Sequence, residues 1–138
     1  MQISILCVDD EKESHDFIDK ILRSWNRSYA ISHVYSPQEA LEFFDKQPFQ
    51  TVLIDLNYGG KALGLDLVKN IREKDANTEL IILSSSQQFE DAQKAMQNGA
   101  NDYLVKGFGR SELLHCLKLA FAQQSLIQKQ ICSLLLIK

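Results

Sequence analysis

The sequence predicts one α/β domain built on a five-stranded parallel sheet that is covered by helices on both faces. Two observations lead to this fold class. Short runs rich in Ile, Leu and Val alternate five times with longer segments whose apolar residues recur at three- and four-residue steps. All but one of the short runs are too continuously apolar to be buried on one face only. The expected architecture is therefore a doubly wound (βα)₅ sheet.

The apolar runs give the five expected strands. These are Ile3–Val8, Ala30–Tyr35, Thr51–Asp55, Leu80–Ser84 and Asp102–Lys106, of which the second is the most polar. In sheets of this class the functional crevice lies beyond the carboxyl ends of the strands, where the strand order reverses.

Between the strands lie the expected helices, Glu13–Trp25, Pro37–Lys46, Leu65–Lys74, Phe89–Asn98 and a fifth from Ser111 onward. The clearest apolar stripe is that of the first, with Phe17, Ile18, Ile21 and Leu22. Ser36-Pro37 is a start signal for the second helix, Gly99 a stop signal for the fourth, and Ser111-Glu112 a start signal for the fifth.

The C-terminal segment predicts a helix longer than the fold needs. Apolar residues continue at alternating steps of four and three, with one polar break, through Leu113, Leu117, Ala120, Gln124, Ile127, Ile131 and Leu134. A helix from Ser111 to Leu136 would be about 39 Å long. We expect a domain over 1–123 and a helical extension or linker over 124–138, acting as a dimerising stalk or as the link to an output domain. The alternative is a small extra helix that folds back onto an apolar patch.

Composition excludes several classes of function. A net charge of −3 lacks the basic excess that direct nucleic-acid binding needs. The apolar runs at the two ends are too short to cross a membrane. Cys7, Cys116 and Cys132 lie in apolar stretches, which favours buried thiols in a reducing, cytoplasmic compartment. The histidines His15, His33 and His115 fall on separate elements without metal-ligand spacing, and none is assigned a role.

Chemistry-bearing residues gather where the strands end. The first strand is followed by Asp9-Asp10-Glu11, and the third, fourth and fifth end in Asp55, Ser84 and Lys106. Clustered acids repel one another until a cation relieves them, and Mg²⁺ suits few carboxylates completed by water and phosphate oxygens. A carboxylate nucleophile, a metal, an ammonium and a hydroxyl together predict a phosphoryl-transfer site.

In these same residues the chain resembles the receiver domains of response regulators from bacterial two-component signalling. The resemblance covers residues 3 to about 123. It is carried by Ile5-Leu6-Cys7-Val8-Asp9-Asp10-Glu11, Val52-Leu53-Ile54-Asp55-Leu56, Gly64-Leu65-Asp66-Leu67-Val68 with Ile71-Arg72, Ile81-Ile82-Leu83-Ser84-Ser85 and Gly99-Ala100-Asn101-Asp102-Tyr103-Leu104-Val105-Lys106.

The resemblance implies a flavodoxin-like receiver fold and a role for each residue. Asp55 would accept a phosphoryl group from a sensor histidine kinase or phosphotransfer protein, with Mg²⁺ as cofactor. Asp10 would bind the metal directly, Asp9 mainly through water, and Asn57 through its backbone carbonyl. Asp55 would also be a metal ligand. Lys106 would bind the phosphoryl group, and Ser84 and Tyr103 would form the switch. The output would be altered contacts, including a homodimer through the face of the fourth helix, fifth strand and fifth helix; the domain would catalyse only its own phosphorylation and dephosphorylation.

Two departures from the family pattern bear on this site. Gly107 stands where Pro usually follows the lysine, which favours a trans Lys106–Gly107 bond. The loop after Asp55 has no Met-Pro and contains Gly59-Gly60, so we expect it to be more mobile than a proline-stiffened loop.

Plainer interpretations exist for each motif. Asp9-Asp10 could be an ordinary turn before a helix, Ser84 a loop residue that caps the next helix, and Tyr103 a static core aromatic. At the level of function, a haloacid-dehalogenase-like phosphatase would also use Asp55 and Mg²⁺, but it wants a second acid where this chain has Asn57. A flavodoxin-like FMN binder would need a phosphate loop where the chain has three acids.

Overall fold

The predicted sheet forms, with all five strands parallel in the order β2-β1-β3-β4-β5. The computed structural model describes residues 2–136. The strands are β1 Ile3–Val8, β2 Tyr29–Val34, β3 Thr51–Ile54, β4 Glu79–Ser84 and β5 Asp102–Val105. The helices are α1 Lys12–Arg23, α2 Pro37–Lys46, α3 Leu63–Lys74, α4 Phe89–Gln97 and α5 Arg110–Leu136.

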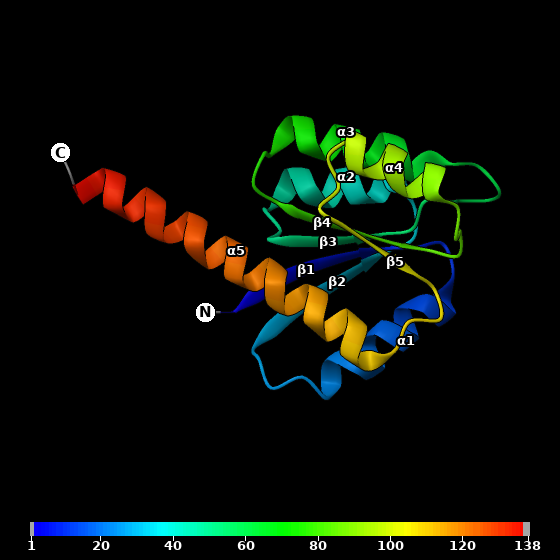
Figure 1. The fold of residues 1–138 in the computed structure, drawn as a ribbon, viewed down its shortest axis with the longest axis horizontal. Helices are drawn as coiled ribbons and strands as arrows, with labels where there is room; N and C mark the ends of the chain where they lie inside the picture. Colours follow the sequence, from blue (N-terminus) through cyan, green and yellow to red (C-terminus); the bar gives the residue numbers. More distant parts are fainter. Residues whose placement is uncertain (1, 137–138) are drawn as a thin grey trace.

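Helices cover both faces of the sheet (Figure 1). α2, α3 and α4 lie on one face and enclose a core that includes Leu6, Val52, Val68 and Ile82. α1 and α5 lie on the other, over a core that includes Ile5, Leu22, Leu53 and Leu113. Alternate residues of one strand thus enter different cores, which is why the strands are apolar throughout.

The strand order reverses at β1. The chain passes from β1 to β2 on one side and then to β3 on the other, so Val8 is paired with both Val34 and Ile54. The carboxyl ends of β1 and β3 therefore lie side by side, and Asp9 and Asp55 follow them directly. This is the edge at which the sequence predicted the functional crevice.

Most predicted start and stop signals are confirmed. The Ser36 side chain accepts a hydrogen bond from the Glu39 amide at the start of α2, and Gly99 adopts a φ of 114° after α4. α5 begins one residue before the expected Ser111, because the Glu112 carboxylate accepts a bond from the Gly109 amide at 3.0 Å.

Two predictions of burial were wrong. Cys132 is exposed, since it lies on the part of α5 beyond the sheet. β5 is an edge strand and its four residues are only half-buried.

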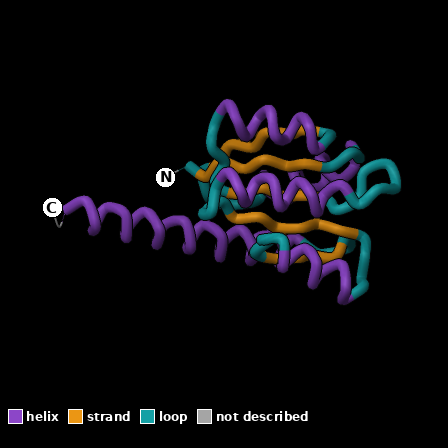
Figure 2. The backbone as a smooth tube through the Cα atoms, turned by 90° about the horizontal axis from the view of Figure 1, so that it is seen from above, coloured by secondary structure: helices purple, strands orange, loops and turns teal. Residues whose placement is uncertain are grey.

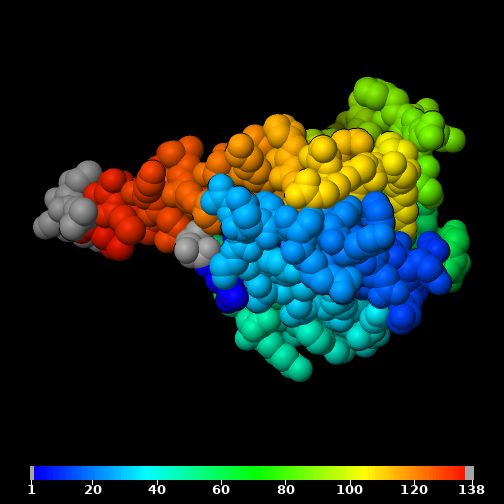
Figure 3. Space-filling view, turned by 90° about the horizontal axis from the view of Figure 1, so that it is seen from below, coloured from blue at the N-terminus to red at the C-terminus, as the bar shows by residue number. Residues whose placement is uncertain are grey.

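The long C-terminal helix is one continuous element through Leu136, so the alternative of a separate, folded-back helix was wrong. Figures 2 and 3 show its C-terminal part projecting from the body of the domain. The polar break in its stripe has a structural reason: the buried Gln124 side chain donates hydrogen bonds to the backbone carbonyls of Asn77 and Gln50. The proposed boundary at 123/124 falls inside this helix and stays a prediction.

Candidate functional site

Four carboxylates meet at the edge where the sheet reverses. Asp9, Asp10 and Glu11 follow β1, Asp55 follows β3, and one oxygen of each lies within 4.8 Å of the others. Asp9 and Asp55 are buried, whereas Asp10 and Glu11 are exposed. Two acids at the floor and two at the rim give an oxygen-lined site that is open to solvent on one side.

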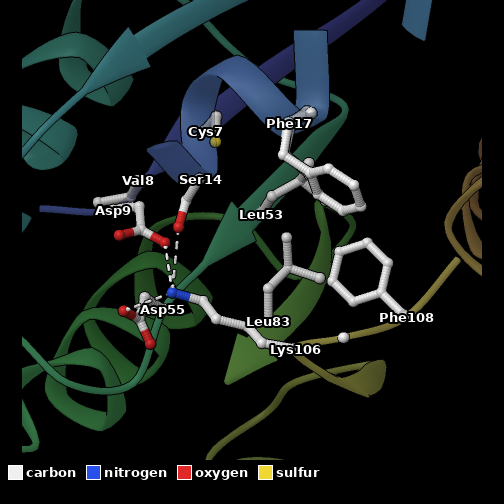
Figure 4. Close-up of a pocket in the computed structure, with 12 residues that line it drawn as sticks. Cys7, Val8, Asp9, Ser14, Phe17, Leu53, Asp55, Leu83, Lys106 and Phe108 are labelled. Atoms are coloured by element: carbon white, nitrogen blue, oxygen red, sulfur yellow. Dashed lines mark hydrogen bonds and ion pairs between the residues drawn. The ribbon is translucent and has the colours of Figure 1, made fainter. Parts of the chain in front are cut away.

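Lys106 reaches into this cluster from the end of β5 (Figure 4). Its Nζ lies 2.9 Å from Asp9 Oδ2 and 3.3 Å from Asp55 Oδ2, and it donates to the Ser14 hydroxyl at 3.2 Å. Its backbone amide donates to the Ser84 carbonyl at 2.6 Å, which fixes the start of the side chain. Ser14 is a site residue that the sequence did not reveal, because a serine in the first turns of a helix carries no distinctive signal.

Burial and charge act in opposite directions here. Burial raises the pKa of Asp55 above its ordinary value, and the Lys106 ammonium offsets part of this rise. Burial by itself lowers the pKa of Lys106, but its hydrogen bond to Asp9 and the charges of Asp55 and Asp9 outweigh that effect and raise it. Lys106 therefore stays protonated, and the Asp55 carboxylate is weakly solvated. This pairing suits a nucleophile beside an anion-binding group.

The loop after Asp55 closes as a small antiparallel turn. Tyr58 and Lys61 exchange two backbone hydrogen bonds, and Gly59 and Gly60 between them have φ of 58° and 81°. The Gly59 amide donates to Asp10 Oδ2 at 3.1 Å, and the Tyr58 hydroxyl donates to the Val8 carbonyl at 3.0 Å. The positive φ values explain the two glycines. The greater mobility expected of this loop stays a prediction.

Gly64 brings α3 against the backbone of Asp55. A Cβ at this position would lie 2.2 Å from the Asp55 carbonyl oxygen and 2.6 Å from Leu56 Cα. The Gly64 amide also donates to the Leu56 carbonyl at 2.9 Å. Because Gly64 has no side chain, α3 can pack directly against the segment that carries Asp55. The sequence motif alone did not explain this glycine.

Ser84 and Tyr103 are linked through Ser86. Ser84 is fully buried, and its hydroxyl accepts a bond from the Ser86 amide at 3.2 Å. The half-buried Tyr103 donates from its hydroxyl to the Ser86 carbonyl at 3.0 Å. The cap-like bond near the start of α4 comes from Ser86, whose hydroxyl accepts from the Gln88 amide. Ser84 thus ends β4 but does not cap α4.

The remaining predicted residues lie nearby. The exposed Asn57 donates its amide to Asp55 Oδ1 at 3.4 Å. The peptide bond between Lys106 and Gly107 is trans, as predicted, and Gly107 has a φ of 101°. Beside Lys106, the rings of Phe17 and Phe108 lie 5.6 Å apart and form an apolar wall (Figure 4).

The donor set fits a hard divalent cation. Carboxylate oxygens converge from four residues, and a backbone carbonyl from the Asp55 loop could add to them. The Lys106 ammonium lies among the same oxygens and would compete with a metal for them. A loosely held Mg²⁺ completed by water and phosphate oxygens suits this balance better than a tight, all-protein site.

Two of the histidines, to which the sequence assigned no role, lie together in the structure. His15 on α1 and His33 on β2 lie on separate elements, as predicted, but their Nδ1 atoms are 2.5 Å apart and Cys7 lies beside them. Sequence spacing could not reveal this cluster, because its members meet only through the parallel pairing of β1 with β2 and the packing of α1.

Comparison with known proteins agrees with this geometry. Residues 5–118 match the response regulator receiver domain family. The chain is 31% identical over 124 residues to the transcriptional regulatory protein DltR of Streptococcus agalactiae, and the match covers 90% of this chain. It covers 54% of DltR, so the chain spans about half the length of this relative.

Among solved structures, the Vibrio cholerae chemotaxis protein CheY4 matches with a TM-score of 0.78 and 24% identity, covering 87% of this chain and 99% of CheY4. NtrX from Brucella abortus matches with a TM-score of 0.83 and 24% identity, covering 97% of this chain and 30% of NtrX. Both likenesses concern the fold.

No helix in the described part of the chain is long and apolar enough to cross a membrane.

Proposed function

This chain belongs to the response regulator receiver domain family, and from that premise we propose that Asp55 is its phosphoacceptor. The Asp55 carboxylate attacks the phosphorus of a phosphohistidine on a sensor kinase or phosphotransfer protein. A P–O bond forms as the P–N bond breaks, and the released imidazole nitrogen takes a proton from solvent. The observation that carries the proposal is the buried Asp55 carboxylate, 3.3 Å from Lys106 Nζ in an acidic pocket.

The neighbouring side chains have separable roles in this proposal. Lys106 binds an oxygen of the transferred group, and the pairing with Asp9 and Ser14 holds it ready. Ser84 donates its hydroxyl to another oxygen once the group is in place. Its link to Tyr103 through Ser86 then gives a path by which phosphorylation alters the face of α4, β5 and α5.

Mg²⁺ is the cofactor that this donor set fits. Asp10 would bind it directly, Asp9 mainly through water, and Asn57 through its backbone carbonyl. Bound there, the metal would supply positive charge to the transferred phosphoryl oxygens. The hydrogen bond from Gly59 to Asp10 already orients the rim carboxylate.

A haloacid-dehalogenase-like phosphatase remains the alternative of a different class, and no observation favours it. The position two residues after Asp55 is Asn57, which cannot act as the second acid. Residues 5–118 match the receiver domain family and give no support to a phosphatase. We therefore propose a cytoplasmic signalling phosphoacceptor that promotes only its own phosphorylation and dephosphorylation and does not bind nucleic acid with this segment.

The decisive test of the phosphoacceptor is intact-protein mass spectrometry after incubation with acetyl phosphate and Mg²⁺. The wild-type chain should gain one phosphoryl group that is lost in base. Asp55→Asn should gain none, and Asp66→Asn, an exposed acid on α3, should behave as wild type. Undiminished labelling of Asp55→Asn would overturn the assignment.

We further propose that α5 forms a dimer with a second copy of the chain. Leu113, Leu117 and Ala120 pack on the sheet, and the same stripe continues beyond it. There Ile131 is 46% and Leu134 66% exposed, at the spacing of a coiled-coil seam. A second helix would cover these residues, with the face of α4, β5 and α5 adjoining the contact.

Sedimentation tests the dimer with three chains. Truncation after Gln123 and the variant Ile131→Glu/Leu134→Glu should both weaken it. Gln123→Glu/Gln130→Glu, which changes exposed polar positions of the same helix, should leave it intact. Beryllofluoride should shift the monomer–dimer balance of the wild type. A full-length chain that stays monomeric at high concentration with and without beryllofluoride would refute the proposal.

A further inference from the structure

A cluster of nitrogen and sulfur ligands lies beneath the acidic pocket and takes no part in the proposed phosphoryl chemistry. Cys7 and His33 are register partners on β1 and β2, which places their side chains on the same face of the sheet. His15 packs over them from α1. One ligand atom from each of the three lies within 4.8 Å of the others, and Cys7 and His15 are each 2% exposed.

The hydrogen bonds around the two imidazoles settle which nitrogens carry protons. His15 Nε2 is 2.8 Å from the backbone carbonyl of Asp9, and His33 Nε2 is 2.8 Å from Asp19 Oδ1. Both partners only accept hydrogen bonds, so each Nε2 must be the N–H donor. In neutral imidazoles both Nδ1 atoms then present bare lone pairs, and these face each other across 2.5 Å. Either a proton on one Nδ1 or a metal ion between the two would relieve this arrangement.

We infer that Cys7, His15 and His33 form a second metal site, selective for a zinc-class ion and separate from the Mg²⁺ pocket. Two imidazoles and a thiolate are the donors that Zn²⁺ takes, and three protein ligands leave its fourth position for water. The Asp9 carbonyl and the Asp19 carboxylate hold the outer nitrogens, as second partners of metal-binding histidines commonly do. Hard Mg²⁺ does not compete well for nitrogen and sulfur.

The geometry is close to that of a bound site. Ligands at about 2.0–2.1 Å for nitrogen and about 2.3 Å for sulfur place two tetrahedral nitrogens about 3.3 Å apart. The Nδ1 atoms must therefore separate by less than an ångström. A bound divalent ion deprotonates a coordinating thiol, so binding releases that proton.

Cobalt(II) provides the test, because its spectrum reports both tetrahedral geometry and thiolate ligation. Metal-free full-length protein is titrated with Co²⁺ in excess Mg²⁺, which keeps the acidic pocket out of the signal. We expect one Co²⁺ per chain, intense visible bands, a near-ultraviolet sulfur-to-metal band, and displacement by one equivalent of Zn²⁺.

Variants assign the ligands. Cys7→Ala should lose the sulfur-to-metal band, and His33→Gln should weaken Co²⁺ binding by more than about 10-fold. Asp19→Asn, which keeps all three ligands and changes a side chain 39% exposed, should weaken it by about 10-fold. The matched control His115→Gln/Cys132→Ser removes the exposed histidine and the exposed cysteine of α5 and should bind as wild type.

The outcomes are distinct from those of the phosphoacceptor test, because Asp55→Asn should keep the cobalt spectrum. Absence of tetrahedral bands in folded wild-type protein would overturn the site and leave a proton shared between the imidazoles. Binding that survives His33→Gln and Asp19→Asn, or that is lost in the α5 control, would also overturn it.

Discussion

Lys106 Nζ lies 3.3 Å from Asp55 Oδ2 and only 2.9 Å from Asp9 Oδ2, so one ammonium is shared by two buried carboxylates. The three residues come from the ends of β5, β3 and β1. The Lys106 ammonium thus balances part of the negative charge that a bound divalent cation would also balance. This sharing leads to predictions of opposite sign for metal binding and for phosphorylation.

Lys106→Ala should bind Mg²⁺ more tightly than wild type and accept phosphoryl groups more slowly. The first effect follows because the ammonium no longer competes for Asp9 and Asp55, and the second because an anion-binding group is lost. Metal titration and the rate of labelling by acetyl phosphate measure the two effects. Lys20→Ala, an exposed lysine of α1, should change neither. Weaker Mg²⁺ binding in Lys106→Ala would contradict the competition.

The pH dependence of stability should reveal the burial of Asp55. Its pKa is raised above the ordinary 3.8, so the folded state holds this proton more tightly than the unfolded state. Stability therefore falls as pH rises through the window between the two pKa values, and the ionised group is destabilising above it. In chelator, Asp55→Asn should be more stable than wild type at neutral pH, and the difference should vanish at pH values below 3.8. Denaturant titrations in which the stabilities of the two proteins do not converge at low pH would contradict this prediction.

Ser84→Ala should still be phosphorylated but should transmit the change poorly. The hydroxyl is the proposed contact that differs between the two states, and Tyr103 is reached from it through Ser86. NMR shifts on α4, β5 and α5 with and without beryllofluoride measure the coupling. Ser85→Ala, an exposed neighbour, should respond as wild type. Full wild-type shifts in Ser84→Ala would show that the switch does not use this hydroxyl.

Gly64→Ala should lower the free energy of unfolding by about 1–3 kcal/mol and slow phosphorylation, because its Cβ would press on the Asp55 backbone. Gly109→Ala is the matched control, since a Cβ there would meet only the Glu112 side chain at 3.7 Å. Thermal unfolding and labelling rates compare the two. A Gly64→Ala chain as stable and as reactive as the control would mean that α3 does not brace this segment.

The sequence predicts the sheet well because burial on both faces of a parallel strand leaves an unmistakable apolar run, as at Val52–Ile54. It predicts the acidic pocket because Asp9, Asp55 and Lys106 each follow a strand directly. It does not predict Ser14, the Tyr58 anchor to Val8, or the bond from Gln124 to Asn77, because these contacts depend on helix rotation and loop closure. The pairing of His15 with His33 was missed for the same reason.

The most direct test of the phosphoacceptor is chemical mapping of the modified residue. Protein labelled with acetyl phosphate and Mg²⁺ is reduced with borohydride, which converts an aspartyl phosphate to homoserine, and is then digested and sequenced by mass spectrometry. Homoserine at position 55 and at no other acid is the predicted result. Homoserine at Asp9 or Asp10 instead, or a stable phosphoryl group on a serine such as Ser84, would contradict the account.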